Sequence, residues 1–355
     1  MPPLARKERG RGAQSNKSGR FEPESREAFD DGWDTDELPP LKTIVALETP
    51  KTIITRNQSP DISFDRSINA YRGCEHGCSY CFARPSHAYM GLSPGLDFET
   101  HLFAKPTAAR LLEQELAAPN YKPRVIAIGT NTDPYQPIER QHLITRQILE
   151  VLDRTNHPVG IVTKSALVVR DIDILSSMAK RGLVRVALSV TTLDRKLARA
   201  MEPRASTPQK RLDAMRQLSD AGIPTSVMAA PIIPALNDSE IEAILSAAFD
   251  HGARDAGYVI LRLPLEVSEI FKQWLLEYYP DRYRHVLSLL RSMRGGKDYD
   301  MAWGQRMRGR GVYADQIAKR IRLAAKRLGM NPRKEALRTD LFTPPVLPGS
   351  QMSLF

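Results

Sequence analysis

The sequence predicts an α/β fold: a core of six strand–helix units on a parallel sheet, followed by a basic, mainly helical C-terminal extension. Two observations carry this prediction. Short apolar runs alternate with amphipathic stretches through the middle of the chain, and positive charge gathers near its end. Strands that alternate with helices form right-handed βαβ units and hence a parallel sheet. The hydrophobic content of 42% is sufficient for a substantial core.

The first 40 residues are divided into two blocks of opposite charge. Residues 1–20 carry six Lys or Arg against one Glu, and residues 21–40 carry eight Asp or Glu against one Arg. Blocks of like charge with few apolar residues usually stay solvated, so residues 1–40 are predicted to be a disordered tail. A basic arm that binds nucleic acid is the alternative, and the plain tail is favoured over it.

Residues 41–66 are predicted to form lead-in strands. Two β-branched runs within residues 42–56 flank Thr49-Pro50, which is a strand–turn–strand pattern. The core is assigned to residues 67–267. Its clearest strand-like runs are Val125–Gly129, Val159–Val162, Val184–Val190, Thr225–Met228 and Tyr258–Leu261. Helical stretches fall near 107–117, 138–153, 170–180, 206–220 and 239–249. With a strand before Cys74 there are six βα units, fewer than the eight that close a full barrel.

Residues 268–335 form the predicted basic helical extension, with helices at 268–293 and 313–328. Residues 282–338 contain sixteen Lys or Arg against four Asp or Glu, interleaved with aromatic residues and glycines. Such a local concentration of cations is typical of a surface that binds the phosphate backbone. Residues 282–338 are therefore predicted to bind nucleic acid, with DNA favoured. A solvated helical cover over the core is the alternative. Residues 336–355 are predicted to be a flexible tail.

All three cysteines lie within eight positions, at Cys74, Cys78 and Cys81, with the spacing C-x3-C-x2-C. Thiolates this close in sequence usually converge on one soft metal centre, and an odd number of cysteines argues against disulfides. A structural zinc site needs four ligands, and His76 is too close to its neighbours for the usual ligand spacing. A [4Fe–4S] cluster on three cysteines leaves one iron open to a small molecule. The spacing favours iron–sulfur over zinc.

This motif, with Tyr80 just before the last cysteine, resembles the signature of the radical S-adenosylmethionine (SAM) superfamily. The run from Ser67 to Cys74 resembles the bacterial branch related to spore photoproduct lyase, often labelled DNA repair photolyases. The resemblance covers roughly residues 45–300. It implies a partial (βα)6 radical-SAM barrel in which Cys74, Cys78 and Cys81 hold a [4Fe–4S] cluster. The open iron would bind SAM, whose reductive cleavage gives a 5′-deoxyadenosyl radical that abstracts hydrogen from the substrate.

The resemblance also implies a set of SAM contacts at the carboxyl ends of the strands. These are Tyr80, Thr130, Asn131, Asp133, Ser189, Thr191, Glu202 and Arg204. Thr130, Asn131 and Asp133 stand where the superfamily has a Gly-Gly-Glu-like segment, and helix capping is the alternative role for that loop. For the later residues the alternatives are capping by Thr192 and a surface ion pair between Glu202 and Arg204. Residues 229–238 are apolar enough to line an adenine pocket.

The resemblance implies an enzyme that acts on nucleic acid, in DNA repair or modification. An electron donor such as flavodoxin or ferredoxin would reduce the cluster. Lyases of this branch use a further cysteine to return hydrogen to the product, and this sequence has none outside the motif. A reaction other than thymine-dimer reversal is therefore favoured. The alternatives are a radical enzyme that modifies RNA or protein, and a non-catalytic zinc-stabilised nucleic-acid-binding protein.

The end of the chain carries one further motif. Gln351–Phe355 resembles the short peptide that docks on bacterial DNA sliding clamps, and it follows a proline-rich tail. No apolar run is long enough to span a membrane, and the N-terminus does not resemble a secretory signal. The three cysteines, all assigned to one centre, suit a reducing cytoplasm. A cytoplasmic protein without a membrane partner is expected.

Overall fold

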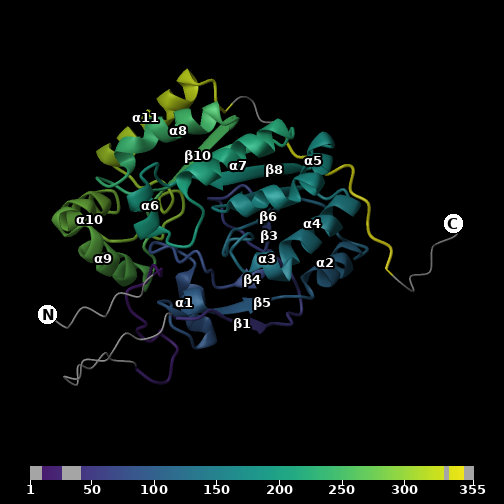
Figure 1. The fold of residues 1–355 in the computed structure, drawn as a ribbon, viewed down its shortest axis with the longest axis horizontal. Helices are drawn as coiled ribbons and strands as arrows, with labels where there is room; N and C mark the ends of the chain where they lie inside the picture. The colour runs from purple at the N-terminus through teal and green to yellow at the C-terminus, as the bar shows by residue number, and fades with distance from the viewer. Residues whose placement is uncertain (1–9, 26–40, 332–335, 348–355) are drawn as a thin grey trace.

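The computed structural model describes residues 10–25, 41–331 and 336–347. Its core is an open seven-stranded sheet with the order β10-β9-β8-β7-β6-β3-β2 (Figure 1). Six neighbouring strands run parallel: β3 (Arg66–Ile68), β6 (Ile126–Ile128), β7 (Val159–Thr163), β8 (Val184–Ser189), β9 (Thr225–Ile232) and β10 (Asp255–Ile260). At one edge β2 (Ile54–Arg56) pairs antiparallel with β3. The predicted partial (βα)6 barrel is confirmed.

Helices follow the strands and cover the sheet (Figure 1). The longer ones in the core are α2 (Ala108–Leu116), α4 (Ile144–Arg154), α5 (Ile172–Lys180), α7 (Pro208–Asp220) and α8 (Ile241–Asp250). The shorter ones are α1 (Asp97–Thr100), α3 (Glu139–His142) and α6 (Arg195–Met201). The 3₁₀ helices are η1 (Arg84–Ser86), η2 (Ala88–Met90), η3 (Ala166–Asp171), η4 (Asp238–Glu240) and η5 (Pro280–Arg282). Ile144, Ile148 and Leu152 lie on one face of α4 and are fully buried, as helical spacing requires.

The two lead-in strands exist, but they do not pair with each other. β1 (Ile44–Leu47) runs parallel to β5 (His101–Ala104) in a small second sheet, and β5 also pairs with β4 (Tyr71–Arg72). β2 instead extends the main sheet. The Thr49-Pro50 turn therefore carries the chain from one sheet to the other rather than closing a hairpin.

The C-terminal extension is mainly helical, as predicted. It contains α9 (Val267–Tyr278), α10 (Tyr283–Ser292) and α11 (Val312–Arg327). The single helix expected over 268–293 is divided at Pro280, which opens the 3₁₀ helix between α9 and α10. This break follows from proline chemistry, because a helix usually ends at or before the residue that precedes a proline. α11 packs against α8 through an apolar face that includes Ile317 and Ile321.

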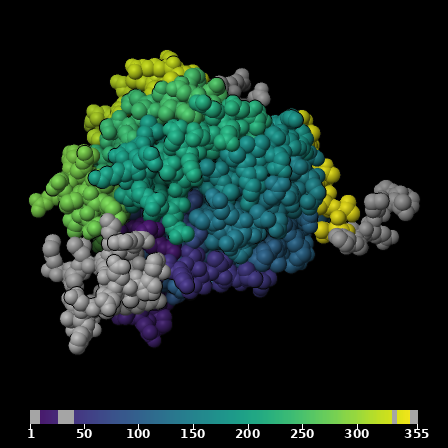
Figure 2. Space-filling model, viewed as in Figure 1, coloured from purple at the N-terminus to yellow at the C-terminus, as the bar shows by residue number. Residues whose placement is uncertain are grey.

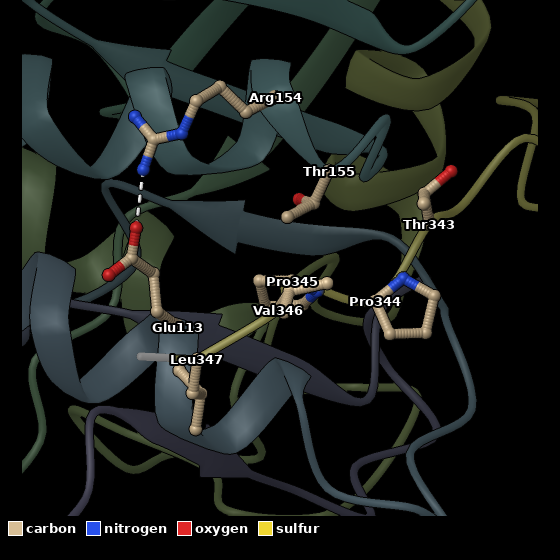
Figure 3. A pocket seen from close by; sticks show the side chains of 8 residues that line it. All are labelled: Glu113, Arg154, Thr155, Thr343, Pro344, Pro345, Val346 and Leu347. Carbon is tan, nitrogen blue, oxygen red and sulfur yellow. Dashed lines mark hydrogen bonds and ion pairs between the residues drawn. The ribbon is translucent and has the colours of Figure 1, made fainter. Parts of the chain in front are cut away.

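The prediction of a flexible tail over 336–355 is wrong for residues 336–347. Phe342 packs against Tyr121 and His157 at 5.5 Å between ring centroids, and the Thr343 N–H donates to the Thr155 carbonyl at 2.9 Å. Beside them residues 343–347 line a cavity of about 450 Å³ with Glu113 and Arg154 (Figure 3). This segment lies across the molecule from α9 and α10 (Figure 2). The clamp-like residues Gln351–Phe355 are outside the described chain.

The prediction of a disordered N-terminal tail over 1–40 is wrong for residues 10–25, which pack against the cysteine loop. Arg11 and Ala13 are buried there. Residues 1–9 and 26–40 are not among the described residues. Within the described chain, no helix has the length and apolarity that a membrane span requires.

Candidate active site

The cysteine loop runs from Gly73 to Phe82, between β4 and η1. Cys74 and Cys78 are buried, Cys81 is partly buried, and all three are free thiols. Gly73 adopts φ +73°, and a side chain there would meet the Leu102 side chain at 2.6 Å, so this turn requires glycine. Backbone bonds from outside the loop fix it, with the Cys74 N–H donating to the Phe98 carbonyl at 2.9 Å. The loop is thus held by contacts that do not involve the thiols.

The donor set of the loop suits an iron–sulfur cluster with one open iron. Burial raises the pKa of the Cys74 thiol well above its ordinary value, and the Asp133 charge adds to this effect. Burial likewise raises the pKa of Cys78 to about 12. Iron must therefore displace protons when the metal-free protein is loaded. Among the described residues, no three Cys, His, Asp or Glu side chains converge closely enough for one ion. Thiolates that bind different irons of a cluster lie further apart than ligands of a single ion.

Tyr80 is locked in place by a buried carboxylate, Glu202. The Tyr80 and Thr191 hydroxyls both donate to Glu202 Oε1, the latter at 2.6 Å, and Arg211 forms an ion pair with Oε2. Arg211 also donates to the Ser189 carbonyl at 2.9 Å. Burial alone would raise the Glu202 pKa, but Arg211 and Lys164 outweigh it and lower this pKa to about 2. Glu202 is ionised, and both its oxygens are engaged within the chain.

Asp133 ties the loop after β6 to its neighbours. It accepts hydrogen bonds from the Thr163 hydroxyl at 2.7 Å and the Lys164 N–H at 2.8 Å. Its Oδ2 lies 3.4 Å from His76 Nδ1. Burial opposes ionisation, but His76 and these hydrogen bonds lower the Asp133 pKa to about 2. His76, considered above as a zinc ligand, lies against this carboxylate.

The remaining predicted residues lie at the same carboxyl end of the sheet. Thr130 and Asn131 are half-buried in the loop after β6, and the Asn131 N–H donates to Asn69 Oδ1 at 3.0 Å. Ser189 is buried at the end of β8. Arg204 is 40% exposed and contacts Glu75 on the cysteine loop at 3.1 Å. The alternative of a surface ion pair between Glu202 and Arg204 is wrong, because Glu202 is buried and pairs with Arg211.

Two cations at the site were not in the predicted set. Lys164 Nζ lies 5.8 Å from the Tyr80 ring centroid, and Cys78 and Glu202 hold its pKa above the ordinary value although burial opposes them. Arg211 is 1% exposed on the inner face of α7, beside Leu212 and Met215. The sequence does carry a signal for Arg211, because this arginine lies within the apolar stripe of a predicted helix. An arginine buried there would need a paired carboxylate, since buried charges are normally paired.

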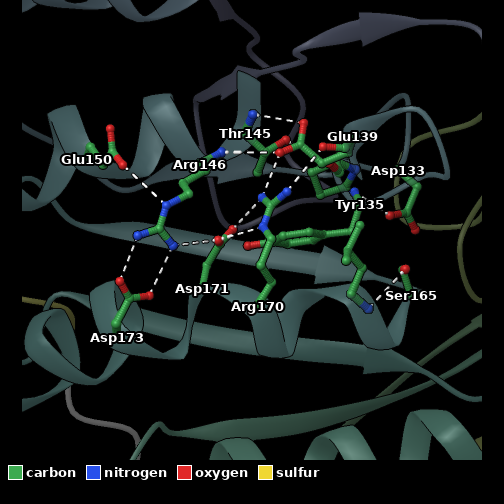
Figure 4. A network of polar contacts seen from close by, with 12 residues as sticks. Asp133, Tyr135, Glu139, Thr145, Arg146, Glu150, Ser165, Arg170, Asp171 and Asp173 are labelled. Atoms are coloured by element: carbon green, nitrogen blue, oxygen red, sulfur yellow. Dashed lines mark hydrogen bonds and ion pairs between the residues drawn. The ribbon is translucent and has the colours of Figure 1, made fainter. Parts of the chain in front are cut away.

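A buried polar network supports the entrance to the loop (Figure 4). Glu139, with no exposed side-chain surface, accepts hydrogen bonds from the Tyr71 hydroxyl and, at 3.0 Å, from the Thr145 N–H. Arg170 pairs with Glu139 at 2.7 Å and with Asp171 at 2.8 Å. Since Tyr71 lies three residues before Cys74, the network fixes where the cysteine loop begins.

Residues 10–25, here called the N-terminal strap, cover the other side of the loop. The Gly12 and Ala13 N–H groups donate to the Glu99 carboxylate at 2.9 and 2.8 Å. Arg84 pairs with the same carboxylate at 2.5 Å and donates to the Cys78 carbonyl at 2.9 Å. A side chain at Gly12 would lie 1.6 Å from the Gly77 carbonyl oxygen, so only glycine allows this approach. The buried Arg84–Glu99 ion pair therefore contacts the strap through Glu99 and the cysteine loop through Arg84.

The strap also reaches the C-terminal extension. Ser15 donates to Gln273 on α9 at 2.9 Å, and Arg20 pairs with Glu266 at 2.5 Å. Ala13 packs in a small apolar cluster with Leu96 and Ile270. Through these contacts the strap joins the cysteine loop to α9.

Comparison with known proteins identifies the family. The family model of the radical SAM superfamily matches residues 68–248, just over half of the chain. The chain belongs to the radical SAM superfamily. It is a radical SAM enzyme, and its cofactors are a [4Fe–4S] cluster and SAM. This membership favours the cluster over the zinc alternative.

Proteins of similar sequence are found in a bacterium and in an archaeon. An uncharacterised protein of Mycobacterium tuberculosis (strain ATCC 25618 / H37Rv) is 36% identical over 230 residues, covering 63% of this chain and 68% of that protein. An uncharacterised protein of Methanocaldococcus jannaschii is 29% identical over 219 residues, covering 62% and 78% of the two chains.

Solved structures of spore photoproduct lyase share the fold of this radical SAM enzyme. The lyase complexed with dinucleoside spore photoproduct gives a TM-score of 0.60 at 17% identity, over 81% of this chain and 80% of that one. A double mutant with bound AdoMet and the same dinucleoside gives a TM-score of 0.51 at 17% identity, over 80% and 78%. At this identity the similarity shows a common fold.

Proposed function

We propose that this radical SAM enzyme acts on a nucleic acid, with DNA ahead of RNA, in repair or modification. The observation that supports this proposal is the charge of the C-terminal extension. Within the described residues 282–331, only one acidic side chain, Asp315, is exposed. The exposed cations there are Arg282, Arg284, Arg291, Lys297, Arg308, Arg310, Lys319, Arg322, Lys326 and Arg327. Such a surface attracts a phosphate backbone irrespective of its sequence.

The shared fold adds support, because the lyase of that fold has been solved with a dinucleoside bound. The chemistry is expected to differ from thymine-dimer reversal. This chain has three cysteines, all within the C-x3-C-x2-C motif, so none is left to return hydrogen to a product radical. Modification of RNA or of protein is the alternative class of reaction.

We assign the cluster to Cys74, Cys78 and Cys81. When bound, the cluster supplies the electron that cleaves SAM, and an electron donor such as flavodoxin or ferredoxin restores it. Of the predicted SAM contacts, seven are kept: Tyr80, Thr130, Asn131, Asp133, Ser189, Thr191 and Arg204. Because both oxygens of Glu202 are engaged, its role is to position Tyr80 and Thr191. Lys164 joins the set as a cation for the SAM carboxylate.

The substrate is tested with cluster-loaded enzyme, SAM and dithionite under anaerobic conditions. Single- and double-stranded DNA, with and without ultraviolet irradiation, are compared with RNA and with protein. DNA is expected to increase the release of 5′-deoxyadenosine and to acquire a SAM-dependent mass change. The variant Arg322→Glu/Arg327→Glu is expected to lower DNA affinity and the slope of log affinity against log salt, because each lost phosphate contact removes about 0.7–0.9 from that slope.

The matched control is Lys122→Glu/Lys180→Glu. It makes the same charge change on exposed residues near the amino ends of the strands, away from the extension. It is expected to leave DNA binding unchanged. A mass change that appears only on RNA or only on protein would contradict the DNA assignment.

We also propose that Gln351–Phe355 recruits the enzyme to a DNA sliding clamp. Apolar Met352, Leu354 and Phe355 would fill a pocket on the clamp while Gln351 hydrogen-bonds at its rim. Purified clamp is expected to retain the full chain, and Leu354→Ala/Phe355→Ala is expected to abolish retention. Ser353→Ala serves as the control within the same peptide. Equal retention of all three proteins would show that the peptide is not a clamp ligand.

A further inference from the structure

The loop between α10 and α11, residues 297–310, is here called the bridging loop. Its base is fixed by Asp298. This carboxylate pairs with Arg291 at 2.6 Å and Lys272 at 2.7 Å, and it accepts the Ser268 hydroxyl at 3.1 Å. Two helices of the extension, α9 and α10, thus hold the start of the loop.

The bridging loop contacts both edges of the open sheet. At the β10 edge the Ile260 N–H donates to the Met307 carbonyl at 2.9 Å. At the β2 edge Asp61, in the turn between β2 and β3, accepts the Gly304 N–H at 2.6 Å and pairs with Arg306 at 2.5 Å. β10 and β2 are the two outermost strands of the sheet. The loop therefore spans the open side of the partial barrel.

The bridging loop presents an exposed tryptophan. Trp303 is 58% exposed, and the Arg306 guanidinium lies 4.2 Å from its ring centroid. Arg306 cannot turn away, because Asp61 and the Ser59 hydroxyl, at 2.5 Å, both hold it. The indole is thus braced by a fixed cation while most of its surface remains in water. The exposed part of this braced ring is available to stack against a planar group.

A second exposed aromatic ring lies beside the cysteine loop. Phe82 directly follows Cys81 and is 43% exposed, and the Arg262 guanidinium lies 4.5 Å from its ring centroid. Arg262 contacts the Met307 sulfur at 3.3 Å. Among the described residues Arg262 forms no ion pair. Because Met307 is the neighbour of Arg306, the two aromatic–arginine pairs are linked through the bridging loop.

We infer that these two pairs form a stacking path for an unpaired nucleic-acid strand, which rests on the nucleic-acid function proposed above. The Phe82–Arg262 pair, next to the cluster loop, takes the reacting nucleotide, and the Trp303–Arg306 pair takes a neighbouring base. Every base offers a flat face to an aromatic ring, and an arginine adds charge attraction to the strand. The exposed cations Lys297 and Arg308 on the same loop supply phosphate contacts.

The test is fluorescence anisotropy of a labelled single-stranded oligothymidylate of about 12 nucleotides, a length within the range that single-strand sites cover. Cluster-loaded enzyme is titrated under anaerobic conditions. Trp303→Ala and Phe82→Ala are each expected to weaken binding about tenfold, as loss of one stacked base predicts. Trp303→Phe, which keeps a ring, is expected to retain most of the affinity. Cluster absorbance of each variant shows that it remains folded and loaded.

The matched control is Tyr89→Ala. Tyr89 is 72% exposed and lies 5.7 Å from the Arg20 guanidinium, but it contacts the strap and not the bridging loop. Its removal is expected to leave affinity unchanged. If the wild type binds and Trp303→Ala and Phe82→Ala bind as Tyr89→Ala does, the stacking path is refuted and the proposed function stands. Equal losses for Trp303→Phe and Trp303→Ala would also refute it. If the wild type does not bind the single strand, the stacking path is also refuted, and the comparison of duplex DNA, RNA and protein substrates described above then decides the proposed function.

Discussion

Cys78→Ala protein is expected to retain no [4Fe–4S] cluster and to cleave no SAM. The chain has three cysteines, so no other thiolate is available to replace the lost ligand. The backbone at Cys78 is also held in place, because Arg84 donates twice to its carbonyl, at 3.0 and 2.9 Å. Iron and sulfide content, and EPR spectra of the reduced protein with and without SAM, measure the outcome.

His76→Gln is the control for this experiment. His76 lies on the same loop, but its ring contacts Asp133, and it is expected to keep the cluster and an EPR signal that shifts on addition of SAM. A full complement of iron in Cys78→Ala, or loss of all iron in His76→Gln alone, would contradict the assignment of the ligands.

Arg211→Met is expected to lower the free energy of unfolding by about 3–5 kcal/mol, because it leaves the Glu202 carboxylate buried without its cation. The double variant Arg211→Met/Glu202→Gln is expected to recover much of this loss, since it removes both charges. Urea denaturation of the cluster-free proteins measures the difference without interference from a bound cofactor. An equal loss in the single and double variants would show that charge burial is not the cause.

The same ion pair predicts a dependence on pH. The Glu202 pKa is about 2 in the folded protein, below the ordinary 4.5. A lowered pKa contributes stability above the ordinary value, and this contribution is lost as the pH falls from about 4.5 toward 2. Glu202→Gln is therefore expected to show a shallower loss of stability over that acidic range than the wild type.

Five of the six parallel strands could be predicted because each contains a short apolar run, of which the fully buried Ile126–Ile128 is one. Val159–Val162 matches β7 to within one residue. Helix interruptions were less visible. The helix expected over 138–153 is broken at Leu143, which adopts φ +53°. No glycine or proline marks that position, so the sequence offered no local signal for the break.

Polar residues that follow apolar strands could be predicted to lie at the carboxyl edge of the sheet, and Asp133 and Thr191 do lie there. Contacts between segments that are distant in sequence could not be predicted. Glu99 holds the backbone of Gly12 and Ala13 across more than 80 residues of sequence. The prediction of disorder over the first 40 residues came from their overall charge and composition. The strap is instead held in place by one buried carboxylate, Glu99, which lies far along the chain.

The strap determines how much of the chain has to be produced to study the chemistry. A protein limited to the matched family region, residues 68–248, would keep all three cysteines but lose Gly12, Ala13 and the whole of α9. The Glu99 carboxylate would then lose two backbone N–H donors and would need water to replace them. One side of the cysteine loop would also become exposed. A protein produced to study the chemistry should therefore include the strap from residue 10 and continue through α9, well beyond the boundaries of the family region.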